Sequence, residues 1–206
     1  MKVLANDGIS QSGEAKLKEY GFEIITNHIP QNELIDFINE NQIAALLVRS
    51  ATKVRQDIID NCPSLKFIGR GGVGMDNIDV AYAREKGIVV NNTPAASSQS
   101  VAELVMAQMF SISRFTHLAN KEMPKSGSED FKVLKKNYGK GVELAGKTLG
   151  IIGFGRIGRA LSSYALGCGM KVITHDRNPV PPTMPVHFHT GQSFEVEIES
   201  GSMDEV

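Results

Sequence analysis

The residues best spaced for chemistry form a glycine-rich turn between an expected strand and an expected helix. The turn consists of Gly153, Phe154, Gly155, Arg156, Ile157 and Gly158. An apolar run over 148–152 predicts a buried strand before the turn, and a second short strand over 171–175 ends at Asp176. A glycine fingerprint in this context, with an acid closing the next strand, is typical of dinucleotide binding.

Each residue type in this arrangement has a physical reason. Gly153 permits the tight turn, Gly155 lets the backbone approach a diphosphate, and Gly158 lets the helix pack closely on the strand. The N–H groups of the first helical turn would hold the phosphates. Asp176 would accept hydrogen bonds from the ribose and repel a 2′-phosphate, which favours NAD over NADP, although the adjacent Arg177 could soften that choice. A glycine-rich turn in another kind of α/β protein is the competing interpretation.

The first half of the chain must position any partner for this turn, and its pattern alternates strands with helices. The expected strands are 2–6, 23–26, 44–48, 65–69 and 88–90, and the expected helices are 12–20, 31–40, 56–61 and 80–86. Ser12 is the candidate cap of the first helix and Gly21 its stop. Apolar strands separated by helices predict a parallel sheet covered on both faces, with ligands at the carboxyl ends of its strands.

Two of these strand ends carry polar groups or bare backbone. Arg49 and Ser50 follow the strand over 44–48 and place a guanidinium and a hydroxyl just past its carboxyl end. A glycine-rich run over 71–74, which includes Val73 and Gly74, follows the next strand, and its exposed N–H groups would form a nest for a carboxylate. A surface arginine and a simple tight turn are the alternatives at these two places.

A crossing between domains is expected at 91–94, and the longest helix follows it. Ser100 and Glu103 have capping-box spacing, although a start one turn earlier also fits. The apolar face of this helix is expected to comprise Val101, Leu104, Val105, Met109, Ile112 and Phe115, interrupted by Gln108. The lysine-rich stretch over 121–141 is expected to be a solvated loop with room for one helical turn.

The composition is that of an ordinary soluble globular protein, with 206 residues, 41% of them hydrophobic, and a net charge of -1. No basic block is present, so neither nucleic acid nor a membrane is expected as a partner. No signal-peptide pattern or membrane-length apolar run is found, which predicts a cytoplasmic location. Cys62 and Cys168 lie in no metal-ligand pattern, so no metal site and no disulfide framework are expected.

Four stretches of the chain resemble the D-isomer-specific 2-hydroxyacid dehydrogenases, and most closely the branch that acts on 3-phosphoglycerate. They are 48–54, 69–79, 92–94 with 101–104, and 143–150 leading into the glycine turn. The resemblance covers nearly everything from Met1 to Asp176. It implies an α/β fold with parallel sheets: a flavodoxin-like substrate domain over 1–94, and the N-terminal part of a Rossmann NAD-binding domain over 95–206.

The resemblance also implies roles on the substrate side. Arg49 and Ser50 would hold a phosphate at one end of the substrate, Arg49 as a charge-assisted donor. The backbone N–H groups around Val73 and Gly74 would take the substrate carboxylate, with Val73 also near the nicotinamide. The reaction implied is the NAD-dependent oxidation of 3-phosphoglycerate to 3-phosphohydroxypyruvate, at the entry to serine biosynthesis.

On the cofactor side, the resemblance implies that the whole glycine turn binds NAD. Arg156 and Ile157 would offer backbone N–H groups to the diphosphate, and Asp176 would hold the ribose. The helix over 98–119 would cross to a second subunit, which implies a homodimer.

The family's catalytic arginine, and its histidine with a paired acid, lie beyond the second strand of the cofactor domain, and this chain ends before them. A proline-rich stretch, a strand-like alternation over 194–199 and a capped helix start over 202–206 follow Asp176 instead. His187 and His189 would share one face of a strand but lack a third metal ligand. We therefore expect a truncated chain with no catalytic residue, no turnover by this segment alone, and an exposed apolar sheet edge near its C-terminus.

Two other functions stay open. A glycerate or hydroxypyruvate reductase would use the same residues on a substrate without phosphate, but Arg49 and Ser50 favour the phosphorylated one. A non-catalytic module that senses NAD would need the glycine turn alone. Arg49 and the nest at Val73 and Gly74 argue against the sensor, because a sensor has no need of substrate contacts.

Overall fold

The computed structural model describes all 206 residues, and the chain divides into two compact units, Met1–Ser97 and Ser98–Val206. The expected strands and helices of the first half are all present, with ends shifted by a few residues. The assignment of 1–94 to substrate and 95–206 to NAD stays a prediction.

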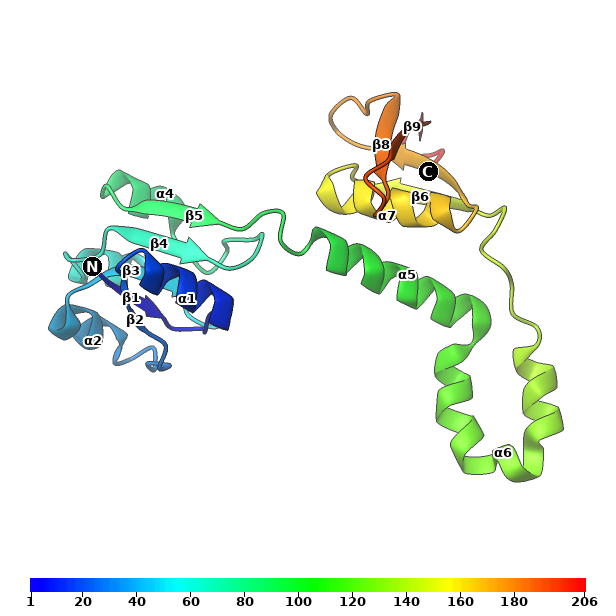
Figure 1. Cartoon of the computed structure of the whole chain (residues 1–206), viewed down its shortest axis with the longest axis horizontal. Coiled ribbons are helices and arrows are strands. Elements are labelled where there is room, and N and C mark those ends of the chain that lie inside the picture. Colours follow the sequence, from blue (N-terminus) through cyan, green and yellow to red (C-terminus); the bar gives the residue numbers. More distant parts are fainter. The chain divides into compact units, whose positions relative to one another are not determined.

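The first unit is a five-stranded sheet in the order β2-β1-β3-β4-β5, and all its neighbours are parallel. Its strands are β1 (Lys2–Ala5), β2 (Glu23–Ile25), β3 (Ile43–Val48), β4 (Phe67–Arg70) and β5 (Val89–Asn92). β4 and β5 run side by side in Figure 1. This is the flavodoxin-like order, in which the direction of winding reverses between β1 and β3. Ligands bind such sheets beyond the carboxyl ends of the strands at that reversal.

Four helices connect these strands: α1 (Gln11–Glu19), α2 (Leu34–Asn41), α3 (Gln56–Asn61) and α4 (Val80–Glu85). The candidate cap at Ser12 is wrong. Ser10 caps α1, because it has the extended backbone that a cap needs and its Oγ accepts the Gly13 N–H at 3.1 Å. Gly21 adopts a φ of +80° just beyond the helix and stops it as expected.

The sheet of the first unit is buried on both faces, because Val3 and Ala45 are only 2% and 4% exposed and point away from the face that carries Leu4, Leu46 and Ile68. Leu4, Leu46 and Ile68, from the three central strands, are fully buried, and so are Ile38 of α2 and Ile58 of α3. Each such side chain stabilises the folded unit by about 1.5–3 kcal/mol relative to an exposed one. The carboxyl ends of β1, β3 and β4 are therefore held at fixed places along one edge of a rigid sheet.

The second unit contains a parallel three-stranded sheet in the order β10-β7-β6. Its strands are β6 (Thr148–Ile152), β7 (Lys171–His175) and β10 (Glu199–Ser200), and α7 (Arg156–Gly167) joins β6 to β7. This is the 3-2-1 order of the first half of a Rossmann sheet. β6 has a neighbouring strand on one side only, and Ile152 at its end is 65% exposed.

Helix α5 (Ser98–Arg114) packs against α7 through only part of the expected face, because Val105 and Met109 contact the shared core as predicted and other predicted residues do not. Ala102 and Met106 are buried in the core shared with α7, whereas Leu104 and Ile112 are 59% and 67% exposed. The short side chain of Ala102 lets the two helices approach closely, so the buried stripe lies to one side of the predicted one. The expected single helix over 98–119 is also interrupted, because Phe115 has a left-handed φ of 55°.

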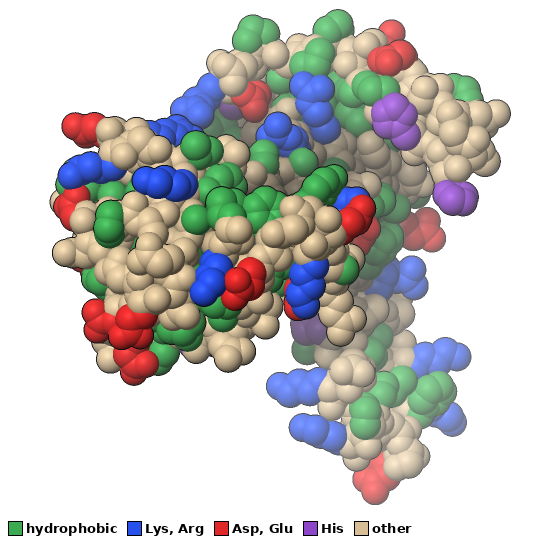
Figure 2. Space-filling model, turned by 60° about the vertical axis from the view of Figure 1, so that its left-hand side comes forward, with side chains coloured by type: hydrophobic (Ala, Val, Ile, Leu, Met, Phe, Trp, Pro, Cys, Tyr) green, Lys and Arg blue, Asp and Glu red, His purple; other side chains and the backbone are tan.

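The expected solvated loop over 121–141 is wrong, because α6 (Thr116–Tyr138) occupies most of it. A straight helix of 23 residues would be about 34 Å long. Yet the Tyr138 hydroxyl donates to the Glu122 carboxylate, and the Tyr138 and Phe115 rings are 6.5 Å apart. The segment therefore doubles back on itself, as Figure 1 shows, and Pro124 and Gly127 lie between Glu122 and Tyr138 in the sequence. Lysines surround it, as the lower part of Figure 2 shows.

The chain continues after β7 with a two-stranded antiparallel hairpin, β8 (Thr183–His187) and β9 (Ser193–Glu197). The strand expected over 194–199 is thus present, although β9 and β10 divide it. Glu205 Oε2 accepts the N–H and the hydroxyl of Ser202 at 2.7 and 2.9 Å, which is one half of the expected capping box. None of the helices combines the length and the apolar character needed to cross a membrane.

Candidate functional site

The glycine turn of the second unit presents unpaired backbone donors. The first bond within α7 runs from the Arg159 N–H to the Gly155 carbonyl at 3.0 Å. The N–H groups of Arg156, Ile157 and Gly158 consequently have no acceptor inside the helix. Together with the positive end of the helix dipole, such groups bind anions, and phosphates in particular. The turn is anchored to β7 through the Gly153 N–H, which donates to the His175 carbonyl at 2.7 Å.

Two glycines of this turn are required for different reasons. A Cβ at Gly158 would overlap the carbonyl oxygen of Gly153, so helix α7 can pack on β6 only if this position has no side chain. A Cβ at Gly155 would meet no protein atom within 4 Å. Packing inside the chain therefore does not explain Gly155, whereas a diphosphate lying against the backbone does. The turn fits the dinucleotide that the sequence predicts.

Asp176 is directed at the glycine turn and held there by backbone donors. Its carboxylate accepts the N–H of Asn178 at 2.9 Å and the N–H of Phe154 at 2.7 Å. These two bonds, that of Asn178 first, hold the pKa of Asp176 below its ordinary value, so the group is charged at neutral pH. A carboxylate has about four acceptor positions, which leaves some free for ribose hydroxyls.

The other residues of the turn have structural contacts. The Phe154 ring is buried against Met184 and Ile198, and its N–H is engaged by Asp176, so its predicted role in cofactor binding would be indirect. The Arg159 guanidinium stands over the Phe154 ring at 5.2 Å. His175, beside Asp176, interacts through Nδ1 with the Gly201 carbonyl at 3.1 Å, which is a structural contact.

In the first unit, Arg49 lies at the reversal point of the sheet with its backbone fixed on both sides. Its N–H donates to Asp7 Oδ2 at 2.6 Å, and its carbonyl accepts from Asn77 Nδ2 at 2.8 Å. The Arg49 and Ser50 side chains are exposed on this turn. The backbone is thus ordered while the guanidinium faces outward, which is the arrangement that an anion-binding arginine needs.

Asp7 is a site residue that sequence reasoning missed. Besides the Arg49 N–H, its carboxylate accepts the Thr52 hydroxyl at 2.6 Å and the Thr52 N–H at 3.1 Å. Burial raises the pKa of Asp7. The hydrogen bonds from Thr52 and Arg49, together with the charge of His28, lower it by more than burial raises it, so the pKa of Asp7 lies below its ordinary value. The available signal was its place directly after β1, at the reversal point.

An Asp7→Ala variant is expected to unfold about 2 kcal/mol more easily at neutral pH, because three donors lose their acceptor. The pKa of Asp7 is lower in the folded chain than in the unfolded one. Its contribution to the free energy of unfolding is therefore fully present when the pH is above the ordinary pKa of 3.8, and it is lost as the pH falls through the folded pKa. Urea unfolding of the wild-type protein and the Asp7→Ala variant, at pH 7 and near pH 3, measures this difference in stability. A stability difference that stays constant with pH would contradict the assignment.

The loop after β4 leaves two backbone donors unpaired. The Gly71 N–H donates to the Val48 carbonyl and the Gly72 N–H to Thr93 Oγ1, both at 2.8 Å. The N–H groups of Val73 and Gly74 have no acceptor within the chain. The predicted carboxylate nest therefore coincides with the two donors that the fold leaves free.

Arg70 is a second residue that sequence reasoning passed over. Its guanidinium packs directly on Gly72, where any side chain would overlap it. Its Nε is buried without a hydrogen-bond partner. An arginine with no carboxylate beside it adds positive charge next to the nest.

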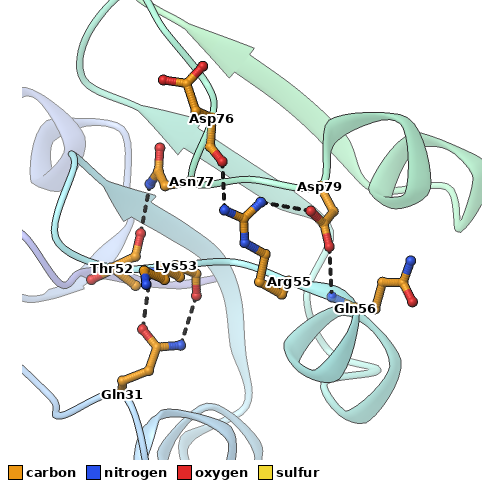
Figure 3. A network of polar contacts seen from close by, with 8 residues as sticks. All are labelled: Gln31, Thr52, Lys53, Arg55, Gln56, Asp76, Asn77 and Asp79. Atoms are coloured by element: carbon orange, nitrogen blue, oxygen red, sulfur yellow. Dashed lines mark hydrogen bonds and ion pairs between the residues drawn. The ribbon is translucent and has the colours of Figure 1, made fainter.

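A polar network joins these strand ends, and Figure 3 shows part of it. The Arg55 guanidinium donates to Asp79 Oδ1 at 2.8 Å and to the Asp76 carbonyl at 2.7 Å. Asn77 Nδ2 donates to the Thr52 carbonyl at 2.7 Å. The segments after β3 and β4, far apart in sequence, are thereby held together.

Fold and site define a two-unit α/β protein: a flavodoxin-like unit with unpaired donors along one sheet edge, and a sheet in the order of the first half of a Rossmann fold, with a glycine-rich turn of the kind that binds dinucleotides. The family model described as "D-isomer specific 2-hydroxyacid dehydrogenase, catalytic domain" matches residues 3–195. The chain belongs to this family, whose members are NAD-dependent D-2-hydroxyacid dehydrogenases. The resemblance noted from the sequence motifs is confirmed.

Named relatives lie on both sides of the substrate question. Hydroxypyruvate reductase of Thermotoga maritima is 42% identical over 189 residues, which cover 91% of this chain and 59% of the relative. D-3-phosphoglycerate dehydrogenase of Methanocaldococcus jannaschii is 43% identical over 176 residues, covering 85% of this chain and 32% of the relative. The chain thus spans between a third and three fifths of the length of these relatives.

A solved structure supports the same fold. D-lactate dehydrogenase from Aquifex aeolicus, complexed with NAD and lactic acid, aligns with a TM-score of 0.67 at 27% identity, covering 100% of this chain and 57% of that protein. The α/β fold with parallel sheets, predicted from the sequence, is confirmed by this likeness and by the sheet order.

Proposed function

We propose that this chain carries the substrate-binding unit and the first half of the NAD-binding unit of a dehydrogenase that oxidises 3-phosphoglycerate to 3-phosphohydroxypyruvate. The observation that carries the proposal is the pair of anion-binding groups on one sheet edge. The Arg49 guanidinium is exposed on a fixed turn after β3, and the N–H groups of Val73 and Gly74 are unpaired after β4. A substrate with a phosphate at one end and a carboxylate at the other matches such a pair.

In the proposed reaction, the C2–H bond of the substrate breaks and both of its electrons leave with the hydrogen, while the C2 hydroxyl becomes a carbonyl and loses its proton. NAD supplies the acceptor for that hydride when it is bound. Arg49 and Ser50 would hold the phosphate, and the nest would orient the carboxylate next to C2. The proton goes to a general base, which we assign to no residue of this chain.

The cofactor would lie on the glycine turn, with its diphosphate on the N–H groups of Arg156 and Ile157. We expect an Asp176→Ala variant to bind NAD about tenfold more weakly, because charge-assisted bonds to the ribose are lost. Its preference for NAD over NADP should fall as well, since the repulsion of the 2′-phosphate disappears. Calorimetric titration with both cofactors measures this. Asn178→Ala is the matched control, because the backbone N–H that orients Asp176 remains, and a tenfold loss there too would contradict the role of the acid.

The direct test of function is turnover by the full-length gene product with NAD and 3-phosphoglycerate, followed through the absorbance of NADH. We expect kcat/KM for 3-phosphoglycerate to exceed that for D-glycerate by at least about tenfold, the effect of one charge-assisted contact. Equal or higher efficiency with D-glycerate would overturn the choice of substrate.

A hydroxypyruvate or glycerate reductase is the second candidate, and the 42% identical relative of that name favours it. It would use the same nest and glycine turn and make no use of the Arg49 guanidinium. A non-catalytic NAD sensor is a third alternative from another class. Such a sensor would bind NAD with the same affinity whether or not 3-phosphoglycerate is present. Titrations with NAD in the presence and in the absence of 3-phosphoglycerate therefore distinguish a sensor from an enzyme.

We also propose that the chain forms a homodimer through α5, as the resemblance implies. The exposed Leu104 and Ile112 on this helix support an apolar contact with a second copy. A place at the entry to serine biosynthesis follows from the proposed substrate, and the cytoplasmic location stays a prediction from the sequence.

A further inference from the structure

The Asn77 side chain makes two bonds to the turn that carries Arg49. Its Nδ2 donates to the Arg49 carbonyl at 2.8 Å and to the Thr52 carbonyl at 2.7 Å, so both amide hydrogens are used. The bond to Thr52 is drawn in Figure 3. No other side chain from the loop after β4 reaches the carbonyl of Arg49.

Asn77 belongs to the same loop as the carboxylate nest. Two residues separate it from Gly74, the nearer of the two nest residues, and no helix or strand intervenes. Its bonds therefore join the two anion-binding groups of the proposed site: the exposed arginine at one end and the free N–H groups at the other.

We propose that Asn77 is a positioning residue that fixes the spacing between the phosphate-binding and carboxylate-binding ends of the site, and so selects substrates by length. The inference rests on the proposed function, because it assumes a ligand anionic at both ends. On this proposal, a three-carbon acid with a terminal phosphate would contact both ends, and an unphosphorylated acid would contact only the nest.

The residue type suits this task. A primary amide presents two donors in one plane to two carbonyls, which neither a hydroxyl nor a carboxylate can do. The surrounding bonds keep the two segments together without it. The Asp79 N–H donates to the Val54 carbonyl at 3.0 Å, and the Arg55 guanidinium donates to the Asp79 carboxylate and the Asp76 carbonyl. Loss of the Asn77 side chain should thus loosen the Arg49 turn and leave the unit folded.

The experiment compares the dissociation constants of 3-phosphoglycerate and D-glycerate, measured by calorimetry on the full-length gene product. In Asn77→Ala, we expect the preference for 3-phosphoglycerate to fall about tenfold, while D-glycerate binds within about twofold of wild type, because misplacement of one anchor by a fraction of an ångström has effects of this size. Asn77→Asp should lose the preference further, since its carboxylate would face two carbonyl oxygens.

Gln31→Ala is the matched control. The Gln31 amide also makes two bonds to this turn, donating to the Lys53 carbonyl at 2.8 Å and accepting the Lys53 N–H at 3.0 Å, but it comes from outside the loop of the nest. It should lower the melting temperature by a similar amount and keep the preference. If Asn77→Ala keeps the wild-type preference, or Gln31→Ala loses it equally, the spacing role is overturned while the proposed function stands. If the wild-type protein binds 3-phosphoglycerate and D-glycerate equally well, both the proposal of a phosphorylated substrate and the proposed role of Asn77 are overturned.

Discussion

A Gly155→Ala variant should bind NAD about 100-fold more weakly than the wild-type chain and unfold at the same or a slightly higher temperature. The added methyl group meets no protein atom within 4 Å, and the local φ of -78° and ψ of -159° suit alanine. The folded state therefore gains no strain, and the unfolded chain loses some entropy. The methyl group would instead occupy the space through which a diphosphate reaches the unpaired N–H groups.

The neighbouring glycine provides the contrasting variant. Gly158→Ala should unfold about 2–3 kcal/mol more easily, because its Cβ overlaps the Gly153 carbonyl and no side-chain rotation relieves a clash with backbone. Thermal unfolding followed by circular dichroism and calorimetric titration with NAD measure the two effects separately. Wild-type affinity for NAD in Gly155→Ala would show that the diphosphate does not lie on this turn.

The second large effect is expected at Arg49. In the full-length gene product, Arg49→Ala should raise the KM for 3-phosphoglycerate about 100-fold and change kcat/KM for D-glycerate less than about threefold. A charge-assisted contact with phosphate accounts for a loss of that size. The turn itself should persist, because Asp7 and Asn77 hold the Arg49 N–H and carbonyl, which alanine retains.

Lys53→Ala is the control for charge alone, since it removes an exposed cation from the same turn. We expect little selectivity change there. An equal loss with both substrates in Arg49→Ala would make Arg49 a general binding residue and favour the hydroxypyruvate-type reductase. Unchanged KM values for both substrates would show that the substrate phosphate does not bind at this sheet edge.

Local patterns were sufficient for the glycine turn and its acid. Gly153, Gly155 and Gly158 have backbone requirements that short-range sterics impose, and a strand–turn–helix context is visible in the apolar pattern around them. For the same reason the strands of the first unit were predictable. Their burial on both faces leaves continuous apolar runs, and only the exact ends differed.

The doubled-back helix α6 shows where local patterns were insufficient. Its lysine-rich sequence with Pro124 and Gly127 resembles a loop, because both residues disfavour helix interiors. In the folded chain, Tyr138 contacts Glu122 and Phe115, which are well separated from it in sequence. A local sequence pattern does not reveal such contacts. The buried face of α5 was predicted only in part for a related reason. Val105 and Met109 pack on the core as expected, but the burial of Ala102 and Met106 depends on contact with α7, which lies far along the chain.

The sequence by itself determined the family and the parallel α/β class, and it supplied the residues that we propose face ligands, namely Arg49, the glycine-rich loop after β4, and the turn at 153–158 with Asp176. Only the tertiary structure decided which groups hold them in place. Asp7 and Asn77 follow different strands and are distant in sequence from the Arg49 turn, and the 2-1-3-4-5 strand order brings all three to one sheet edge. Hydrogen bonds of this kind depend on how the strands align in the folded sheet, which cannot be predicted from the spacing of residues along the chain.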